Sequence, residues 1–195
     1  MSNPNHVCYA DLPGYHLSDL GRRQAAASGR YLGTMAHGAL LLTSPLDRAA
    51  ETAAAIAEWV DADPVVDRRL IEWGLAGRWA GTVWEEIPDR FPGELEAYLA
   101  HPHDLSFSPE SIAAAAGRMA AVVADLDRDH PLATAIVVSH QDPLQALRLH
   151  LLGRPLSELG EEKPRHGEVI TLERRGGRWV ERSRWEPAPA DRVSG

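Results

Sequence analysis

The sequence has a single cysteine, Cys8, and no hydrophobic run long enough to cross a bilayer. One thiol cannot form an internal disulfide bond. The richest apolar segments, ALLLTS and ATAIVVSH, are short and end in polar residues, whereas a membrane helix needs about 20 apolar residues. The first residues, MSNPNHV, also lack the charged stretch and long apolar run of a secretory signal. These absences predict a soluble, cytoplasmic protein.

Positive charge is in deficit, because 20 lysines and arginines stand against 28 aspartates and glutamates, a formal net charge of −8. An acidic chain has no general electrostatic attraction to nucleic-acid phosphates or to an anionic membrane surface. We therefore expect small molecules or proteins as partners, and the composition predicts no particular oligomeric state. With 195 residues, the chain is long enough for one domain with a sizeable core and too short for two ordinary ones.

Buried strands alternate with amphipathic helices in the first third of the chain. Ser18 precedes a stretch rich in alanine and arginine that ends near Ala36, which predicts a helix with Ser18 as its N-cap. The apolar run ALLLTSP then predicts a buried strand over residues 39–43. A second helix is expected at once, with Pro45 in its first turn. This is a strand–turn–helix unit.

The same pattern returns later. Ser108 and Pro109 predict the N-cap and first position of another helix. ATAIVVSHQDPLQALRLHLLG then reads as strand, turn and helix, closed by Gly153. Such alternation predicts a three-layer α/β/α sandwich with a mainly parallel sheet, whose ligand site lies at the carboxyl ends of the strands.

The remaining segments complete a single domain over residues 1–185. EVITLERRGGRWVERSRW has the period of two strands joined by a Gly-Gly turn, which predicts a β-hairpin near the carboxyl terminus. Residues 73–107 are rich in Trp, Pro, Gly and His without a long period, and we expect them to form an insertion over the site. The tail, residues 186–195, is expected to be disordered.

Three polar residues fall where this architecture would place a site. Arg48 lies in the first turn of a helix after a buried strand, so its guanidinium and the helix-end amides can face one anion. His140 ends the strand AIVVSH at the same edge of the sheet. Glu72 follows a short extended run, and a protonated carboxylic acid there could protonate a leaving oxygen. Taken singly, each is more often an ordinary surface or polar structural residue.

The order of the sequence motifs that contain these residues is more specific than any one of the residues. SPLDRAAETAAAIA, RLIEWGLAGRWAG, SPESIAAAAGRM and IVVSHQDPLQALRLHLLG resemble, in this order, successive motifs of the histidine phosphatase superfamily, which has the phosphoglycerate-mutase-like fold. HLSDLGRRQAAASGRYL is similar to the helix that precedes them. The resemblance runs from about Leu12 to Gly153, and the stretch LPGYHLS is similar to an actinobacterial group of the family.

The resemblance implies a two-step phosphoryl transfer that needs no metal or other cofactor. In the family a histidine in an Arg-His-Gly motif, at the end of the first strand, attacks phosphorus. By motif, Arg48 matches the second arginine and His140 the second histidine, which clamp the phosphoryl oxygens. Glu72 matches the acid that protonates the leaving group, and Ser44 lines the same turn. The implied ligand is a small phosphorylated molecule or phosphate.

The nucleophile of the family has no counterpart at the expected place. Only the residues MSNPNHVCYAD precede LPGYHLS. They contain no strand that ends in Arg-His-Gly. His166 does lie in the sequence KPRHGEV, but no apolar run precedes it and the strand VITLE follows it. We therefore interpret His166 as a residue of a polar loop. His16 is interpreted as a turn residue and His6 as part of a frayed terminus.

Two explanations of this departure stay open: a chain that starts late, or a degenerate member of the family. The first strand of the family lies beside the strand AIVVS, so its absence leaves unpaired backbone groups and a groove in the core. Each unmet buried group costs about 1–3 kcal/mol, against a total stability of about 5–15 kcal/mol. A late start is therefore favoured, unless HVCYA or the hairpin fills the gap.

Two functions follow from these explanations. The first is a metal-independent phosphomonoester phosphatase with a phosphohistidine intermediate, with mutase activity less favoured. The second is an inactive pseudophosphatase that binds phosphorylated ligands. Trp73, Trp79 and Trp84 suggest an apolar or aromatic contact with the substrate, or packing of the insertion onto the core.

Overall fold

The computed structural model describes residues 5–188, and its first helix is the one expected after Ser18. Helix α1 (Asp19–Gly33) begins with Ser18 as N-cap, whose side chain accepts a hydrogen bond from Gly21 N at 3.1 Å. Helix α2 (Asp47–Val60) packs against it. Both helices differ slightly from expectation: α1 ends at Gly33 rather than near Ala36, and α2 begins two residues after Pro45.

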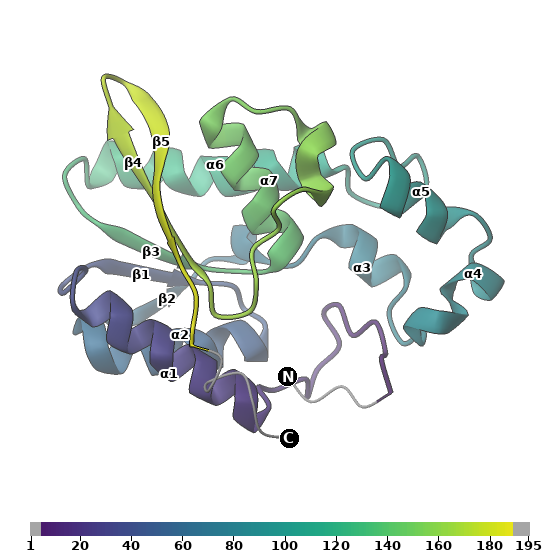
Figure 1. The fold of residues 1–195 in the computed structure, drawn as a ribbon, viewed down its shortest axis with the longest axis horizontal. Helices are drawn as coiled ribbons and strands as arrows, with labels where there is room; N and C mark the ends of the chain where they lie inside the picture. Colours follow the sequence, from purple (N-terminus) through teal and green to yellow (C-terminus); the bar gives the residue numbers. More distant parts are fainter. Residues whose placement is uncertain (1–4, 189–195) are drawn as a thin grey trace.

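The central sheet is parallel. Its strands are β1 (Leu40–Thr43), β2 (Pro64–Val66) and β3 (Ala135–Val138), in the spatial order β2-β1-β3. Helices α1 and α2 lie on one face of this sheet, and α6 (Ile112–Asp129) and α7 (Gln141–Leu152) lie on the other (Figure 1). The predicted α/β sandwich with a mainly parallel sheet is confirmed.

Alternation along the strands supplies a core on each face of the sheet. Leu41 and Ile136 pack with the buried residues of α1 and α2. Leu42 and Val137, one residue further along each strand, pack with Met119 on the other side. The two faces therefore hold separate apolar layers, as expected for a parallel sheet covered on both sides.

The carboxyl-terminal hairpin forms as predicted but stands outside the parallel sheet. Strands β4 (Val169–Arg175) and β5 (Arg178–Trp185) pair antiparallel in a second, two-stranded sheet. Trp185 stacks on Tyr31 of α1 with ring centroids 4.5 Å apart. Arg148 of α7 pairs with Glu181 at 2.5 Å. The hairpin is thus tied to both helical layers.

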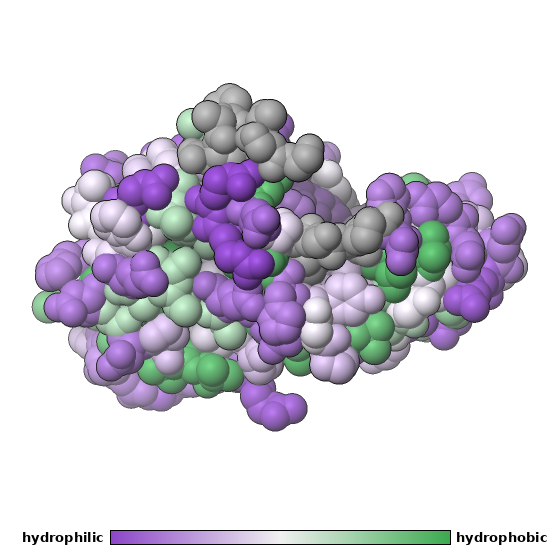
Figure 2. All heavy atoms as spheres, turned by 90° about the horizontal axis from the view of Figure 1, so that it is seen from below, coloured by the Kyte–Doolittle hydropathy of each residue, from purple (hydrophilic) through white to green (hydrophobic). Residues whose placement is uncertain are grey.

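Residues 73–107 form a lobe of short helices. After the 3-10 turn η1 (Arg68–Leu70) come α3 (Gly74–Arg78), η2 (Trp84–Glu86), α4 (Ile87–Arg90) and α5 (Glu94–Ala100). The lobe projects from one side of the molecule (Figures 1 and 2). It has its own core, in which Trp73, Trp79 and Ile87 pack with residues of α6 and with Leu159 of the 3-10 turn η3 (Leu156–Gly160).

The start of α6 was predicted wrongly. Ser111, not Ser108, is its N-cap, and its hydroxyl accepts from Ala114 N at 3.1 Å. Ser108 Oγ instead donates to Glu110 O at 2.6 Å. The Glu110 side chain accepts from Gly74 N at 3.0 Å. These contacts with α3 hold residues 108–110 outside the helix.

The segment HVCYA does not join the parallel sheet. Val7 forms an isolated antiparallel bridge with Val83, and Cys8 N donates to Thr82 O at 2.8 Å. This segment therefore belongs to the lobe. The predicted disordered tail begins at residue 186, and its part from residue 189 onward lies outside the described residues. Within residues 5–188 no helix is long and apolar enough to cross a membrane.

Candidate functional site

A cavity of about 1330 Å³ opens at the carboxyl ends of β1 and β3 and extends into the interior. Its polar end is lined by Arg48, Glu72 and His140, the three residues that the sequence placed at this edge of the sheet. Ser44 joins them through a direct contact with His140. The structure thus brings all four predicted site residues together.

Ser44 and His140 meet because each follows the end of a neighbouring parallel strand. Ser44 comes directly after β1, and His140 is the N-cap of α7, two residues after β3. His140 Nε2 lies 2.8 Å from Ser44 Oγ, and both residues are buried. Between β3 and His140, Ser139 Oγ donates to Leu70 O at 2.7 Å. This bond ties the end of β3 to the turn that leads to Glu72.

Arg48 lies in the first turn of α2, as predicted, and only 11% of its side chain is exposed. Its Nη2 atom is buried and makes no hydrogen bond within residues 5–188, although it lies 3.5 Å from Glu72 Oε2. The guanidinium stacks on the ring of Tyr9, with Cζ 4.8 Å from the ring centroid. Arg48 is therefore a fixed cation with donor capacity left for an anion.

Glu72 lies between Arg48 and His140. Its Oε2 atom is 3.5 Å from Arg48 Nη2 and 3.6 Å from His140 Nδ1. Its Oε1 atom accepts from Trp73 N at 2.9 Å. Burial raises the pKa of Glu72 to about 7, because it outweighs the opposing effects of the Trp73 amide and of Arg48. The carboxyl group can therefore give and take a proton near neutral pH.

His140 is held in its neutral form. Burial is the main cause that lowers its pKa well below the ordinary value of 6.5, and the charges of Arg48 and Arg118 lower it further. A neutral imidazole has one N–H donor and one acceptor nitrogen. It can therefore donate one hydrogen bond to a bound phosphoryl oxygen without adding a positive charge.

Arg118, which the sequence analysis did not single out, holds the segment around Glu72. From α6 its guanidinium donates to Arg69 O at 2.6 Å and to Glu72 O at 3.1 Å, and it pairs with Glu110 at 2.7 Å. Its only signal in the sequence is its place in the motif SPESIAAAAGRM. Arg118 acts on the site by positioning the Glu72 backbone.

A second polar cluster joins the lobe to α7. Tyr98 of α5 donates to Asp142 Oδ2 at 3.0 Å, Lys163 Nζ lies 2.6 Å from Asp142 Oδ1, and Lys163 donates to the Tyr98 hydroxyl at 2.8 Å. The negative charge of Asp142 also contributes to the raised pKa of Glu72. These residues come from separate parts of the chain, so no local pattern could have shown that they meet.

The other histidines considered earlier form no hydrogen bond or ion pair with Arg48, Glu72 or His140 in the described residues, although His6 and His166 line the same cavity. His6 Nδ1 lies 2.8 Å from Glu85 Oε1, and His16 Nδ1 lies 2.5 Å from Glu51 Oε1. His166 stands in the turn before β4 and lines the same large cavity. Within residues 5–188 no hydrogen bond or ion pair joins it to Arg48, Glu72 or His140.

Two of the three tryptophans named earlier are buried, and the third is exposed. Trp73 and Trp79 are buried in the core of the lobe. Trp84 is 40% exposed, lies edge-on to Trp79, and lines the cavity with it. The packing interpretation therefore describes Trp73 and Trp79, and Trp84 is the ring that remains available to a ligand.

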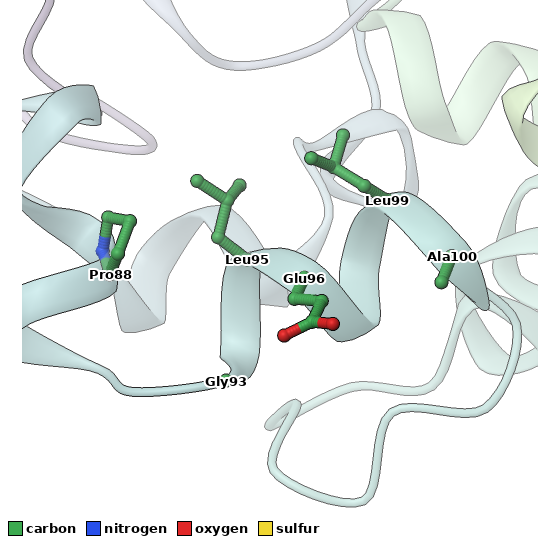
Figure 3. A pocket seen from close by; sticks show the side chains of 6 residues that line it. All are labelled: Pro88, Gly93, Leu95, Glu96, Leu99 and Ala100. Atoms are coloured by element: carbon green, nitrogen blue, oxygen red, sulfur yellow. The ribbon is translucent and has the colours of Figure 1, made fainter.

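A smaller hollow of about 560 Å³ lies along α4 and α5 (Figure 3). It is lined by Pro88, Gly93, Leu95, Glu96, Leu99 and Ala100. Glu96 is the only charged residue among them, and none of the predicted site residues is present. Among residues 5–188 no group of three or more His, Cys, Asp or Glu side chains is arranged to hold a metal ion.

Comparison with known proteins agrees with this geometry. The model of the histidine phosphatase superfamily (branch 1) matches residues 3–186. Phosphoserine phosphatase 1 of Hydrogenobacter thermophilus is 31% identical over 151 residues, which cover 77% of this chain and 71% of that protein. An uncharacterised protein of Mycobacterium tuberculosis is 36% identical over 169 residues, which cover 80% of this chain and 76% of that protein.

A solved structure shares the fold. A mycobacterial glucosyl-3-phosphoglycerate phosphatase, solved in complex with VO3, superposes with a TM-score of 0.83 at 27% sequence identity. The match covers 95% of this chain and 93% of that one. The predicted phosphoglycerate-mutase-like fold is confirmed.

Proposed function

The chain belongs to the histidine phosphatase superfamily, and from this premise we propose that its site is the phosphate clamp of a metal-independent phosphomonoester phosphatase. The observation that carries the proposal is Arg48 Nη2, a buried donor without a hydrogen-bond partner in the described residues, beside Glu72 and His140. Such a group costs about 1–3 kcal/mol unless an acceptor meets it, and a phosphoryl oxygen is such an acceptor.

The substrate we propose is a small phosphorylated molecule in the cytoplasm. Two similar proteins support this, because their names specify phosphoserine and glucosyl-3-phosphoglycerate, both small phosphate esters. The net charge of −8 argues against a nucleic-acid substrate.

In the proposed reaction an imidazole nitrogen attacks phosphorus, so that an N–P bond forms as the ester P–O bond breaks. Glu72 gives its proton to the departing oxygen. Water then attacks phosphorus, Glu72 takes a proton from that water, and the N–P bond breaks to release the imidazole and phosphate. Arg48, Ser44 and neutral His140 hold the phosphoryl oxygens in both steps. A Glu72 pKa of about 7 suits both proton transfers.

This reaction needs an imidazole besides His140. By motif His140 matches the second histidine of the family, whose ring holds a phosphoryl oxygen and does not attack phosphorus. We propose that the phosphohistidine forms on a histidine of the Arg-His-Gly type that the family resemblance implies, delivered to this clamp from beyond residues 5–188.

A second candidate function is binding of phosphorylated ligands without turnover. It is favoured by the fact that Arg48, Glu72 and His140 lie together, whereas His6, His16 and His166 form no hydrogen bond or ion pair with them in the described part of the chain. The two candidates share the clamp and differ in the source of the nucleophile.

Phosphate binding tests the clamp itself. We expect millimolar phosphate to raise the thermal midpoint of the wild-type protein by several degrees, because a ligand that binds only the folded state stabilises it. Arg48→Ala should abolish this shift, whereas Arg178→Ala, at an exposed position of β5, should keep it. Equal shifts in all three proteins would refute both candidate functions.

The DNA upstream of the Met1 codon separates the two candidates. An in-frame apolar strand that ends in Arg-His-Gly supports the phosphatase. An in-frame stop codon immediately before Met1 leaves the clamp without that nucleophile and supports the ligand-binding function.

A further inference from the structure

The position of Glu72 fixes where the alcohol part of a phosphate ester lies. A proton donor must come within hydrogen-bond reach of the departing oxygen, so the alcohol lies beside Glu72. Trp73, the first residue of the lobe, follows Glu72 directly and donates from its backbone N to Glu72 Oε1 at 2.9 Å. We call this part of the cavity the lobe end, and the lobe residues that line it are Trp73, Leu75, Ala76, Trp79, Trp84 and Tyr98.

None of these six side chains carries a charge, and the polar atoms of the buried tryptophans are already engaged inside the protein. Trp73 Nε1 donates to Glu110 O at 2.7 Å. Trp79 Nε1 donates to Glu94 Oε2 at 3.0 Å. Both indoles therefore offer carbon atoms, and no N–H donor, to a ligand in the cavity.

Tyr98 is engaged in the same way. Its hydroxyl donates to Asp142 Oδ2 at 3.0 Å and accepts from Lys163 Nζ at 2.8 Å. Lys163 Nζ also lies 2.6 Å from Asp142 Oδ1, so the two opposite charges are paired. The ammonium group of Lys163 is thus not available to a negatively charged substrate group, and the ring of Tyr98 faces the cavity as a further aromatic surface.

The amino-terminal segment, residues 6–10, lines the cavity without adding a free charge. The Tyr9 ring stacks on the Arg48 guanidinium, with Cζ 4.8 Å from the ring centroid. Burial raises the pKa of the Cys8 thiol, which stays uncharged at neutral pH. The His6 ring is held by Glu85 at 2.8 Å. This segment therefore adds a second aromatic ring close to the clamp.

The other basic side chains that line the cavity are three arginines outside the lobe, and each is paired with a carboxylate. Their partners lie at 2.5, 3.1 and 3.2 Å, respectively, in the pairs Arg148 with Glu181, Arg165 with Glu186 and Arg174 with Asp127. In the described part of the chain, Arg48 is thus the cation that the site offers, and the phosphoryl group occupies it.

We propose that the substrate is a phosphate ester of an uncharged aromatic alcohol, whose ring packs against the aromatic side chains of the lobe end. This inference rests on the proposed function, because the role of Glu72 places the alcohol there. A carboxylate in the alcohol, as in phosphoserine, would lose water without gaining a second cation, which is unfavourable. An aromatic ring gains by leaving water and by edge-on or offset contact with an exposed ring such as Trp84.

The test measures binding of stable phosphonates to the 195-residue protein by isothermal titration calorimetry. Carbon replaces the ester oxygen in these compounds, so no turnover can occur. We expect benzylphosphonate to bind about tenfold more tightly than ethylphosphonate. 3-Phosphonopropionate, which carries a carboxylate at the same distance, should bind no more tightly than ethylphosphonate. Inorganic phosphate, titrated in the same way, reports on the clamp alone.

One pair of variants tests the aromatic contact. Trp84→Ala should weaken benzylphosphonate binding about tenfold and leave ethylphosphonate binding unchanged. Leu99→Ala is the control, because Leu99 is 69% exposed on the same lobe and does not line this cavity. It should leave the affinities for both compounds unchanged.

A second pair tests the missing cation and does not depend on the folding of Trp84→Ala. Ala76→Lys places an ammonium group on α3 at the lobe end and should strengthen binding of 3-phosphonopropionate about tenfold. Leu99→Lys adds the same charge outside the cavity and should not.

The outcomes separate this inference from the proposed function. If phosphate binds but benzylphosphonate binds no more tightly than ethylphosphonate, or less tightly than 3-phosphonopropionate, the inference is wrong and the clamp stands. Equal effects of Trp84→Ala and Leu99→Ala would also overturn it. If phosphate itself does not bind, the proposed function fails, and this inference fails with it.

Discussion

Glu72 Oε2 lies 3.5 Å from the Arg48 guanidinium, and a cation at that distance ordinarily lowers a carboxyl pKa. In this structure the pKa of Glu72 is raised instead, because the cost of removing the carboxylate from water exceeds the stabilisation that the ion pair provides. Motif resemblance identified Glu72 as the acid. Only its burial in the folded site, with a smaller contribution from the negative charge of Asp142, explains why its pKa is raised.

A prediction about stability follows from this pKa. Below pH 4.5 Glu72 is protonated in both states, and its contribution to folding is fully present. As pH rises from 4.5 through the folded-state pKa of about 7, the unfolded chain releases a proton that the folded protein keeps, so that contribution is lost. Glu72→Gln should therefore match the wild type at pH 4.5 and exceed it by up to about 3 kcal/mol at pH 8.

Urea denaturation of both proteins at the two pH values measures this difference. His140 is present in both proteins, so its own titration cancels to first order. Glu58→Gln, the same substitution at an exposed position of α2, is the control variant. A difference between Glu72→Gln and wild type that is the same at both pH values would contradict a raised pKa.

The elements with a regular period were predicted best from the sequence. The N-cap Ser18, the strand before His140 and the closure of α7 by Gly153 all depend on residues close in sequence. The start of α6 was wrong because residues 108–110 are held by α3, which no local signal shows. The short helices of the lobe were missed for the same reason, since their turns are fixed by packing.

Gly29 and Gly33 of α1 permit the close approach of α1 and α2. A Cβ at Gly29 would lie 2.9 Å from Ala55 O and 2.7 Å from Trp59 Cδ1. Gly29→Ala should therefore destabilise the protein by about 1–3 kcal/mol through overpacking, despite the better helix propensity of alanine. Thermal or urea denaturation measures the effect.

Gly117 of α6 is the matched control. A Cβ there would meet no atom within 4 Å, so Gly117→Ala should stabilise the protein by about 0.5–1 kcal/mol. If both substitutions stabilise the protein, the two helices can separate at little cost, and the close packing inferred at Gly29 is wrong.

At the scale of the whole molecule, the sequence predicted the order of layers but not the shape between them. Alternation of strands and helices was enough for a covered parallel sheet, and the family resemblance led us to expect a groove along AIVVS. The structure has a cavity there, with the hairpin β4–β5 as its far wall. The hairpin's position depends on contacts such as Trp185 with Tyr31, which join residues far apart in the chain.

Activity is also a property of the whole arrangement. We expect the 195-residue protein to show no turnover of a generic aryl phosphate above background, even at millimolar substrate. Arg48 and His140 can bind and polarise a phosphoryl group, but water must attack directly when no positioned imidazole does so. A well-oriented nucleophile contributes about 7–11 kcal/mol to lowering such a barrier. Release of the aryl alcohol, followed by absorbance, measures the rate.

His166 decides how a positive result would be interpreted. It lines the same cavity as the clamp, and burial lowers its pKa below the ordinary value of 6.5, so it would be neutral and nucleophilic if it reached phosphorus. Turnover that His166→Ala abolishes, and that His6→Ala and His16→Ala preserve, would make the sequence PRHGEV the nucleophile motif. Our interpretation of His166 as a loop residue would then be wrong.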